Sequence, residues 1–209
     1  MKTRIAVFVS GGGTNLQALI DAAAAGNLPS GEIALVLASR PDAYALTRAK
    51  NAGIATAVVS RKETGTQDAF EEGILHALRE HKIEMIVLAG FMSILSENFT
   101  SRFPKRILNV HPSLIPAFCG KGYYGLKVHE EALARGVKVT GATVHFVNEI
   151  PDGGEIIYQG AVAVEPGDTP EILQRRVMEQ AEWKLLPRAA EKVASDIRTD
   201  AGYPKMMLD

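Results

Sequence analysis

Residues 5–25 read IAVFVSGGGTNLQALIDAAAA, and this stretch decides the fold class. The short apolar run Ile5–Val9 predicts a buried strand, and the amphipathic stretch Leu16–Ala25 predicts a helix. The loop Ser10–Asn15 between them carries three consecutive glycines. A strand, a tight glycine turn and a helix form the first half of a βαβ unit, so we expect a parallel sheet.

The following residues repeat this alternation of short apolar runs and longer amphipathic stretches. Asp42 is expected to cap a helix over Ala43–Ala52, and Thr66 is expected to cap the next helix. The runs that we predict as parallel strands are Ile5–Val9, Ile33–Leu37, Ala55–Val59, Met85–Ala89 and Ile107–Val110.

The pattern changes in the last third of the chain. Two long strand candidates, Val137–Val147 and Ile156–Val164, are joined by the turn-rich segment Glu149–Gly154, so they should be antiparallel neighbours. Thr169 predicts the cap of a long C-terminal helix, which Pro187 should kink or interrupt. We therefore predict an α/β protein with a Rossmann-like open twisted sheet. The sheet should be mainly parallel with antiparallel C-terminal strands, and helices should cover both faces.

Length and composition limit the class of protein. We expect residues 1–209 to form a single domain with a frayed tail from about residue 200. Lys and Arg total 23 against 24 Asp and Glu, which argues against a nucleic-acid partner held by bulk charge. No apolar run approaches the roughly 20 residues that span a bilayer, so no membrane partner is expected. Cys119 is the single cysteine, which excludes an intramolecular disulfide and suits the reducing cytoplasm.

The glycine loop Ser10–Asn15 is the first candidate binding site. Glycines let a backbone approach an anion closely, and the following helix N-terminus offers free N–H groups with partial positive charge. Leu16 stands where a dinucleotide fingerprint needs its third glycine, and no Gly-Lys-Ser/Thr follows for a P-loop. A single phosphate therefore suits the loop better than a pyrophosphate. The alternative is a tight turn that binds nothing.

Asn109-Val110-His111, at the end of the fifth predicted strand, is the second candidate site. Ligands of open α/β sheets bind beyond the carboxyl ends of the strands, and residues two apart on a strand share a face. An amide beside an imidazole can hold a developing oxyanion while the imidazole moves a proton. Asp152, in a later Pro-Asp-Gly-Gly turn, could orient His111 and favour its protonated form. A structural histidine and an ordinary turn are the alternatives.

The other histidines predict no function. His76 and His81 fall on a polar helix region, His129 falls in the helical stretch Leu126–Ala134, and His145 falls on a strand face. No His-Glu-x-x-His or comparable spacing occurs, so no metal site is predicted.

Five ordered segments together resemble the phosphoribosylglycinamide formyltransferase family. They are SGGGTNLQALI at 10–20, LAGFMSILS at 88–96, NVHPSLIPAF at 109–118, GATVHFVNEIPDGGEII at 141–157 and EWKLLP at 182–187. The resemblance implies transfer of a formyl group from the co-substrate 10-formyltetrahydrofolate to the amine of glycinamide ribonucleotide, in de novo purine biosynthesis. It implies direct transfer through a tetrahedral intermediate, in the cytoplasm and without a metal. A homodimer is compatible with the sequence, which leaves the oligomeric state open.

Carried over by position, the resemblance implies three groups of site residues. Asn109, His111 and Asp152 would be catalytic. The ribonucleotide substrate would be bound by Gly12, Gly13, Thr14, Asn15 and Glu182, with its phosphate at Gly13, Thr14 and Asn15. The reduced folate would be bound by Gln67, Met92, Ser93, Ile94, Leu95, Asn109, Asn148, Glu149, Ile150, Pro151 and Asp152.

Two departures from the family pattern concern the folate. Many relatives carry an arginine where this chain has Ser93, and another near the position of Gln67; those arginines would attract the anionic folate glutamate tail. Lys121 or Lys127 would then supply the missing charge. The stretch Lys121–Gly125 is also longer than in many relatives, and the sequence leaves open whether it acts as a lid.

Three other functions share parts of the pattern. Methionyl-tRNA formyltransferase has a similar core with an added C-terminal nucleic-acid-binding domain, for which we expect this chain to be too short and too evenly charged. Formyltetrahydrofolate hydrolase usually has an extra N-terminal regulatory domain, which is not expected here. A non-catalytic nucleotide-sensing module could use the glycine loop, but it would not need an Asn-x-His pair opposite a carboxylate.

Overall fold

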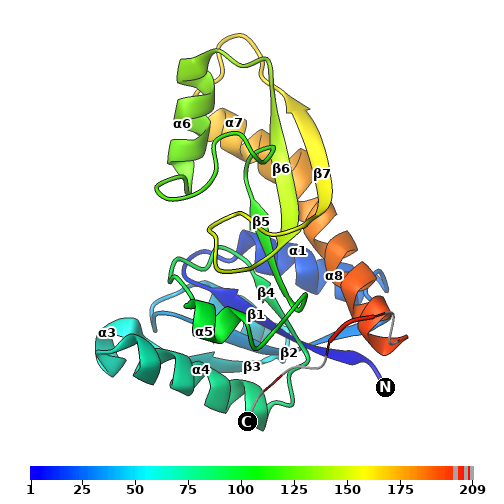
Figure 1. Cartoon of the computed structure of the whole chain (residues 1–209). Helices are drawn as coiled ribbons and strands as arrows, with labels where there is room; N and C mark the ends of the chain where they lie inside the picture. The colour runs from blue at the N-terminus through cyan, green and yellow to red at the C-terminus, as the bar shows by residue number, and fades with distance from the viewer. Residues whose placement is uncertain (200–201, 205–206, 208–209) are drawn as a thin grey trace.

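The chain forms a seven-stranded sheet with helices on both faces (Figure 1). The computed structural model describes residues 1–199, 202–204 and 207. The strands are β1 (Thr3–Val9), β2 (Gly31–Ala38), β3 (Ala55–Val58), β4 (Met85–Leu88), β5 (Ile107–His111), β6 (Val139–Phe146) and β7 (Ile156–Ala163). The helices are α1 (Thr14–Ala24), α2 (Ala45–Asn51), α3 (Arg61–Thr64), α4 (Gln67–Glu80), α5 (Glu97–Thr100), α6 (Leu126–Arg135), α7 (Pro170–Val177), the π-helical turn η1 (Met178–Glu182) and α8 (Trp183–Arg198).

The strand order is β3-β2-β1-β4-β5-β6-β7. The first five strands are parallel to one another, whereas β6 is antiparallel to β5 and β7 is antiparallel to β6. The predicted fold class is therefore confirmed. Successive strands are added on one side of β1 as far as β3 and on its other side from β4 onward. This topological switch point lies between β1 and β4, where open α/β sheets bind ligands.

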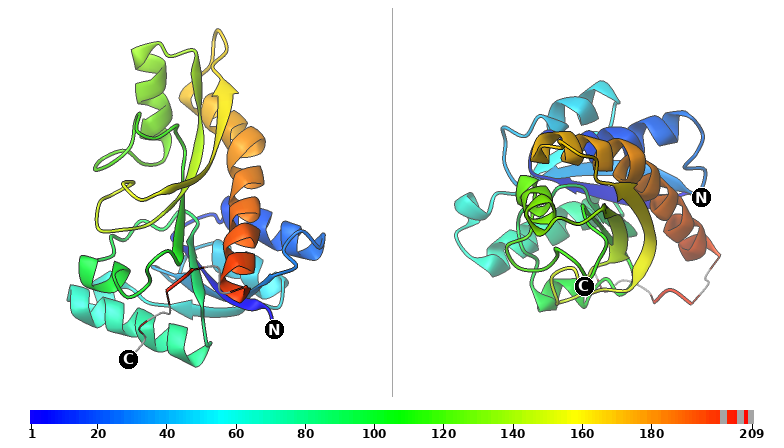
Figure 2. Two further views of the ribbon diagram at one scale, coloured as in Figure 1. Left: turned by 45° about the vertical axis from the view of Figure 1, so that its right-hand side comes forward. Right: turned by 90° about the horizontal axis from the view of Figure 1, so that it is seen from above.

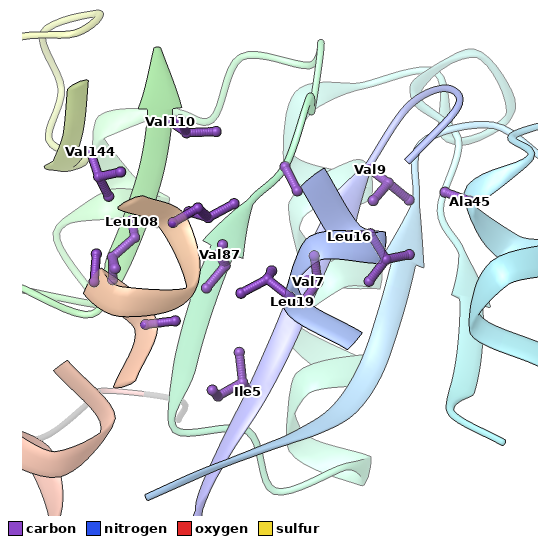
Figure 3. Close-up of a cluster of buried hydrophobic side chains, with 14 of the residues drawn as sticks. Ile5, Val7, Val9, Leu16, Leu19, Ala45, Val87, Leu108, Val110 and Val144 are labelled. Atoms are coloured by element: carbon purple, nitrogen blue, oxygen red, sulfur yellow. The ribbon is translucent and has the colours of Figure 1, made fainter. Parts of the chain in front are cut away.

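The parallel strands are buried on both faces. Ile5, Val7 and Val9 of β1 belong to one apolar cluster with Leu16 and Leu19 of α1 (Figure 3). The alternate residues of β1 join a second cluster on the opposite face, against α4 and α5. Burial on both faces explains why the predicted parallel strands are continuous apolar runs.

Side-chain caps begin two helices at the predicted residues. Thr66 Oγ1 accepts a hydrogen bond from Ala69 N at 3.2 Å at the start of α4. Thr169 Oγ1 accepts one from Ile172 N at 3.4 Å at the start of α7. Each cap satisfies a first-turn N–H that has no partner within its helix.

Two other helix predictions need correction. Helix α2 begins at Ala45 rather than at residue 43, because the Asp42 carboxylate pairs with Arg40 at 2.7 Å instead of capping the helix. Pro187 lies inside α8, and the departure from α geometry falls earlier, in η1 between α7 and α8.

Strands β6 and β7 continue past the carboxyl ends of the parallel strands, with α6 and α7 beside them (Figure 2). The predicted tail from about residue 200 falls partly outside the described residues. Within them, the Tyr203 hydroxyl donates to Asp196 Oδ2 at 3.2 Å, and Arg106 Nε donates to the Pro204 carbonyl oxygen at 2.7 Å. None of the helices in the described chain is both long and apolar enough to cross a membrane.

Candidate active site

The three residues predicted to be catalytic lie together at the carboxyl end of β5. Asn109 and His111 belong to β5, and Asp152 belongs to the loop between β6 and β7. His111 Nδ1 lies 3.4 Å from Asp152 Oδ2, and Asn109 Nδ2 lies 3.5 Å from Asp152 Oδ1. An acid from the antiparallel part of the chain therefore reaches an imidazole at the rim of the parallel strands.

A tight turn places the Asp152 carboxylate. Asp152 has a positive φ of 57°, and the Gly153 N–H donates to the Ile150 carbonyl oxygen at 2.9 Å. A Cβ on Gly154 would lie 1.8 Å from the Phe146 carbonyl oxygen, so only glycine fits there. Aspartate is among the non-glycine residues that adopt positive φ most readily. The Pro-Asp-Gly-Gly sequence therefore forms a turn, and that turn orients the Asp152 carboxylate toward β5.

His145 joins this group, although the sequence pattern assigned it no function. It stands opposite Asn109 in the register of β5 and β6, and its Nε2 accepts from Asn109 Nδ2 at 3.2 Å. Its Nδ1 donates to the Phe146 carbonyl oxygen at 2.7 Å, which fixes the ring. Nε2 also lies 3.5 Å from Asp152 Oδ1. His145 can therefore orient the amide of Asn109.

The charges of His111 and Asp152 are set by burial and by each other. Burial lowers the pKa of His111, while the Asp152 carboxylate and the Phe118 carbonyl raise it in part. Burial by itself raises the pKa of the Asp152 carboxyl, but His145, His111 and the Gly120 N–H outweigh it and leave this pKa below its ordinary value. The Asp152 carboxylate favours protonated His111, but burial has the larger effect on the pKa of that ring.

The loop between β5 and α6 contacts both catalytic candidates through backbone atoms. The Phe118 carbonyl oxygen lies 2.8 Å from His111 Nε2, and the Gly120 N–H donates to Asp152 Oδ2 at 2.8 Å. Neither residue was predicted, because a backbone contact has no side-chain signature in the sequence. The segment Lys121–Gly125 follows directly, and its role as a lid stays a prediction.

The glycine loop joins β1 to α1, which begins at Thr14 rather than at Leu16. Gly13 caps the helix with φ 72°, and a Cβ there would lie 2.6 Å from Ala45 Cβ. Thr14 and Asn15 therefore belong to the first helical turn, where backbone N–H groups have no helical acceptor. Gly12, Gly13, Thr14 and Asn15 thus form a helix N-terminus of the kind that binds anions.

Asn15 also contacts Glu182, so two members of the predicted substrate site meet. Asn15 Nδ2 donates to Glu182 Oε2 at 2.7 Å. Glu182 is 6% exposed, and burial raises its pKa to about 7 although Asn15 opposes the rise. Asn15 Oδ1 is buried and has no partner among the described residues. This pair offers buried acceptors that hydroxyl groups of a ligand could satisfy.

The predicted folate segment after β4 lies beside the glycine loop. Met92 N donates to Ser10 Oγ at 2.9 Å, and Gln67 Nε2 donates to the Ile94 carbonyl oxygen at 3.1 Å. Met92 and Ile94 are 57% and 77% exposed, which is unusual for such large apolar side chains. Leu95 is buried in the apolar cluster on the α4 face.

The second predicted folate segment follows β6 and borders the same apolar cluster, against which Val147 packs. Asn148 Oδ1 accepts from Ile150 N at 3.0 Å, and Ile150 is 57% exposed. The remaining members of the predicted folate site are the exposed Glu149 and Pro151 and the half-buried Ser93.

Among the described residues, no cluster of three or more His, Cys, Asp or Glu side chains is placed to hold a metal ion. Chemistry without a metal stays a prediction. The sheet, the glycine loop at a helix N-terminus and the group of an amide, an imidazole and a carboxylate define the class as an α/β domain with polar groups of the kind that acyl transfer uses. The chain belongs to the formyl transferase family, whose model matches residues 3–190.

Known proteins are similar over most of this chain. The phosphoribosylglycinamide formyltransferase of Haemophilus influenzae is 44% identical over 184 residues, which cover 88% of this chain and 84% of that protein. The trifunctional purine biosynthetic protein adenosine-3 of Homo sapiens is 44% identical over 194 residues, or 93% of this chain. The chain spans only 14–19% of the length of the trifunctional relatives that it matches.

Solved structures share the fold. The crystal structure of phosphoribosylglycinamide formyltransferase from Brucella melitensis has a TM-score of 0.85 and 44% identity, and the match covers 93% of this chain and 97% of that one. Glycinamide ribonucleotide transformylase 1 from Symbiobacterium toebii has a TM-score of 0.86 at 40% identity, covering 93% and 88%.

Proposed function

We propose that the protein transfers a formyl group from 10-formyltetrahydrofolate to the amine of N1-(5-phosphoribosyl)glycinamide, a step of de novo purine biosynthesis. The observation that carries the proposal is the meeting of Asn109, His111 and Asp152 at the end of β5. The names of the relatives from Haemophilus influenzae and Brucella melitensis support the same substrate.

The reaction begins when the neutral amine attacks the formyl carbon. A carbon–nitrogen bond forms, and the formyl oxygen becomes an oxyanion that Asn109 stabilises by a hydrogen bond. Burial lowers the pKa of His111, which favours the neutral imidazole that can accept the proton lost by the amine. The imidazolium then stabilises the oxyanion beside Asp152. It returns the proton to N10 of the folate as the bond from carbon to N10 breaks.

The ribonucleotide binds along the start of α1. Its phosphate accepts hydrogen bonds from the N–H groups of the glycine loop and the first turn, in the favourable field of the helix dipole. Its ribose hydroxyls lie at Glu182 and at the unpartnered Asn15 Oδ1. In this binding mode the amine would point toward the end of β5.

The folate ring binds between the two segments that follow β4 and β6. The exposed side chains of Met92, Ile94 and Ile150 would be covered by a flat ring, which removes apolar surface from water. Polar groups of Asn148 and of the backbone would select the edge of the ring. The formyl group then reaches Asn109 and Asp152.

One assay tests the proposal against the hydrolase alternative. Purified protein is mixed with the ribonucleotide and 10-formyltetrahydrofolate, and the release of tetrahydrofolate is followed. Release that requires the ribonucleotide supports formyl transfer. Equal release without it indicates a hydrolase, and binding of the ribonucleotide without any release indicates a nucleotide-sensing module.

A cytoplasmic location and a homodimer also stay proposals. The single cysteine supports a reducing compartment, although the relative from Arabidopsis thaliana is named as chloroplastic. Analytical ultracentrifugation of the purified chain measures the oligomeric state directly.

A further inference from the structure

Arg48 ties helix α2 to the glycine loop. Its Nε donates to the Gly12 carbonyl oxygen at 2.8 Å, and its Nη1 donates to Gln17 Oε1 at 3.0 Å. Its guanidinium lies over the ring of Tyr44, 5.1 Å from the ring centre. These three contacts hold a half-buried side chain in a defined position next to the predicted phosphate site.

Helix α2 makes a parallel contact one residue earlier in the loop. The Ala45 N–H donates to the Gly11 carbonyl oxygen at 3.1 Å. The carbonyl groups of Gly11 and Gly12 are thus both held by α2, one by a backbone group and the other by the Arg48 side chain. The contact made by a side chain is the one that mutation can remove.

Holding a carbonyl group also sets the direction of the next N–H group. In a trans peptide unit, the carbonyl oxygen of one residue and the N–H of the following residue point in opposite directions in one plane. Fixing the Gly12 carbonyl on Arg48 therefore aims the Gly13 N–H away from Arg48. The positive guanidinium also polarises this peptide unit, which strengthens its N–H as a donor.

We propose that Arg48 is a positioning residue for the substrate phosphate, acting through the Gly12–Gly13 peptide unit without touching the phosphate. The inference rests on the proposed function, because it assigns the anion in the loop to the ribonucleotide. Without Arg48 the Gly12 carbonyl group loses the partner that orients it, and the Gly12–Gly13 unit can rotate more readily because glycine has no Cβ to restrict its backbone. The loop would then have to be ordered when the substrate binds, and affinity for the phosphate would fall.

The test separates phosphate binding from a general loss of structure. Arg48→Ala is expected to raise KM for the ribonucleotide about tenfold, the effect of losing a charge-assisted hydrogen bond. KM for 10-formyltetrahydrofolate should not change. With the substrate lacking its phosphate, glycinamide riboside, kcat/KM should be equal in wild type and variant. Arg48→Lys keeps a donor that can reach the Gly12 carbonyl oxygen and should recover most of the loss.

Lys50→Ala is the matched control, because Lys50 is a cation on the same helix and has no contact with the glycine loop in the described structure. It should leave KM for the ribonucleotide unchanged. Equal losses with ribonucleotide and riboside, or a loss as large in Lys50→Ala, would overturn the inference. An unchanged Arg48→Ala enzyme would do the same.

Two measurements keep the inference distinct from the proposed function. If thermal melting shows that Arg48→Ala does not fold, Arg48→Gln and Arg48→Lys are compared with the wild type instead. If the wild-type protein releases no tetrahydrofolate, the proposed function fails, but binding of inorganic phosphate by calorimetry still tests Arg48. Weaker phosphate binding in Arg48→Ala than in Lys50→Ala is then the expected result, and equal binding would overturn the role of Arg48.

Discussion

Nδ1 of His111 lies 3.4 Å from Oδ2 of Asp152, and Nε2 of the same ring lies 2.8 Å from the Phe118 carbonyl oxygen. Acceptors therefore face both ring nitrogens. The doubly protonated imidazole can donate a hydrogen bond to each acceptor, whereas the neutral ring can donate to only one of them. Burial opposes the charge and lowers the pKa of His111. In the proposed reaction, this ring takes up the proton that the amine loses.

Removal of either member of this pair is expected to slow turnover while the fold persists. We expect His111→Ala and Asp152→Asn each to lower kcat at least about 100-fold, because each removes proton transfer or the group that stabilises the imidazolium. Steady-state kinetics and thermal melting measure the two effects. His76→Ala, at an exposed histidine of α4, is the control. Near-normal turnover in either site variant would reject the assignment.

Much of this site could be predicted from the sequence because its parts are local. Asn109 and His111 are two residues apart on a strand that the sequence predicts to be buried, so the period of a strand suffices to put them on one face. The glycine loop is a continuous segment, so the conformational freedom of glycine suffices to predict its turn. The direction of β6 and β7 followed from the short turn that joins them.

The rest depends on register and on backbone atoms. His145 belongs to the site because it stands opposite Asn109, and nothing in either segment fixes that pairing before the strands are aligned. A shift of one residue would turn His145 to the other face of the sheet. Phe118 and Gly120 contact the site through a backbone carbonyl and a backbone N–H, which residues of nearly every type carry, so no residue type identifies them.

His145 is expected to act through Asn109. Replacing His145 with leucine removes the acceptor that orients the Asn109 amide, so kcat should fall about tenfold to a hundredfold while KM stays the same. In an Asn109→Ala background the same replacement should cost little more, because residues that act as a unit are not additive. Fully additive losses would show that His145 works independently of Asn109.

His129 should make stability depend on pH. It is fully buried in α6, and neither ring nitrogen has a partner among the described residues. Burial, with a smaller effect of the charge on His111, lowers its pKa to about 4. The unfolded chain has an ordinary pKa of about 6.5, so it binds more protons below that pH. The free energy of unfolding is therefore unaffected by His129 titration above about pH 6.5, and it decreases as the pH falls from there toward 4.

This group alone should cost on the order of 2 kcal/mol of unfolding free energy between about pH 7 and about pH 5. Denaturant unfolding of the wild type and of His129→Leu at these two pH values measures the difference. The leucine variant should lose correspondingly less stability on acidification, whereas His76→Leu should behave as the wild type does. Parallel losses in all three proteins would mean that His129 does not titrate as described.

Glu182 is expected to serve binding rather than turnover. Its carboxyl is buried beside Asn15, and burial raises its pKa to about 7. Glu182→Gln replaces one acceptor oxygen with a donor, so KM for the ribonucleotide should rise about tenfold while KM for the folate and kcat stay the same. Glu63→Gln, at an exposed acid of α3, is the matched control. A fall in kcat without a change in KM would place Glu182 in the chemistry instead.

The last prediction concerns the cation that meets the anionic folate tail. The sequence pointed to Lys121 or Lys127, both of which are exposed. The structure adds Arg61, whose Nε donates to Gln67 Oε1 at 3.1 Å. Gln67 in turn donates to the Ile94 carbonyl oxygen in the predicted folate segment, so Arg61 is a cation linked to that segment through Gln67.

We expect Arg61→Ala to raise KM for 10-formyltetrahydrofolate about two- to fivefold, the size of a solvent-exposed charge interaction. The rise should shrink with added salt, which screens such charges, and should vanish with a formyl donor that lacks the glutamate. Lys121→Ala and Lys127→Ala are measured in the same way, with Lys62→Ala as the control for loss of charge on α3. A variant whose defect disappears with the shortened donor identifies the cation. An unchanged KM in Arg61→Ala would exclude Arg61 as the cation that contacts the folate tail. An unchanged KM in both Lys121→Ala and Lys127→Ala would exclude the two lysines.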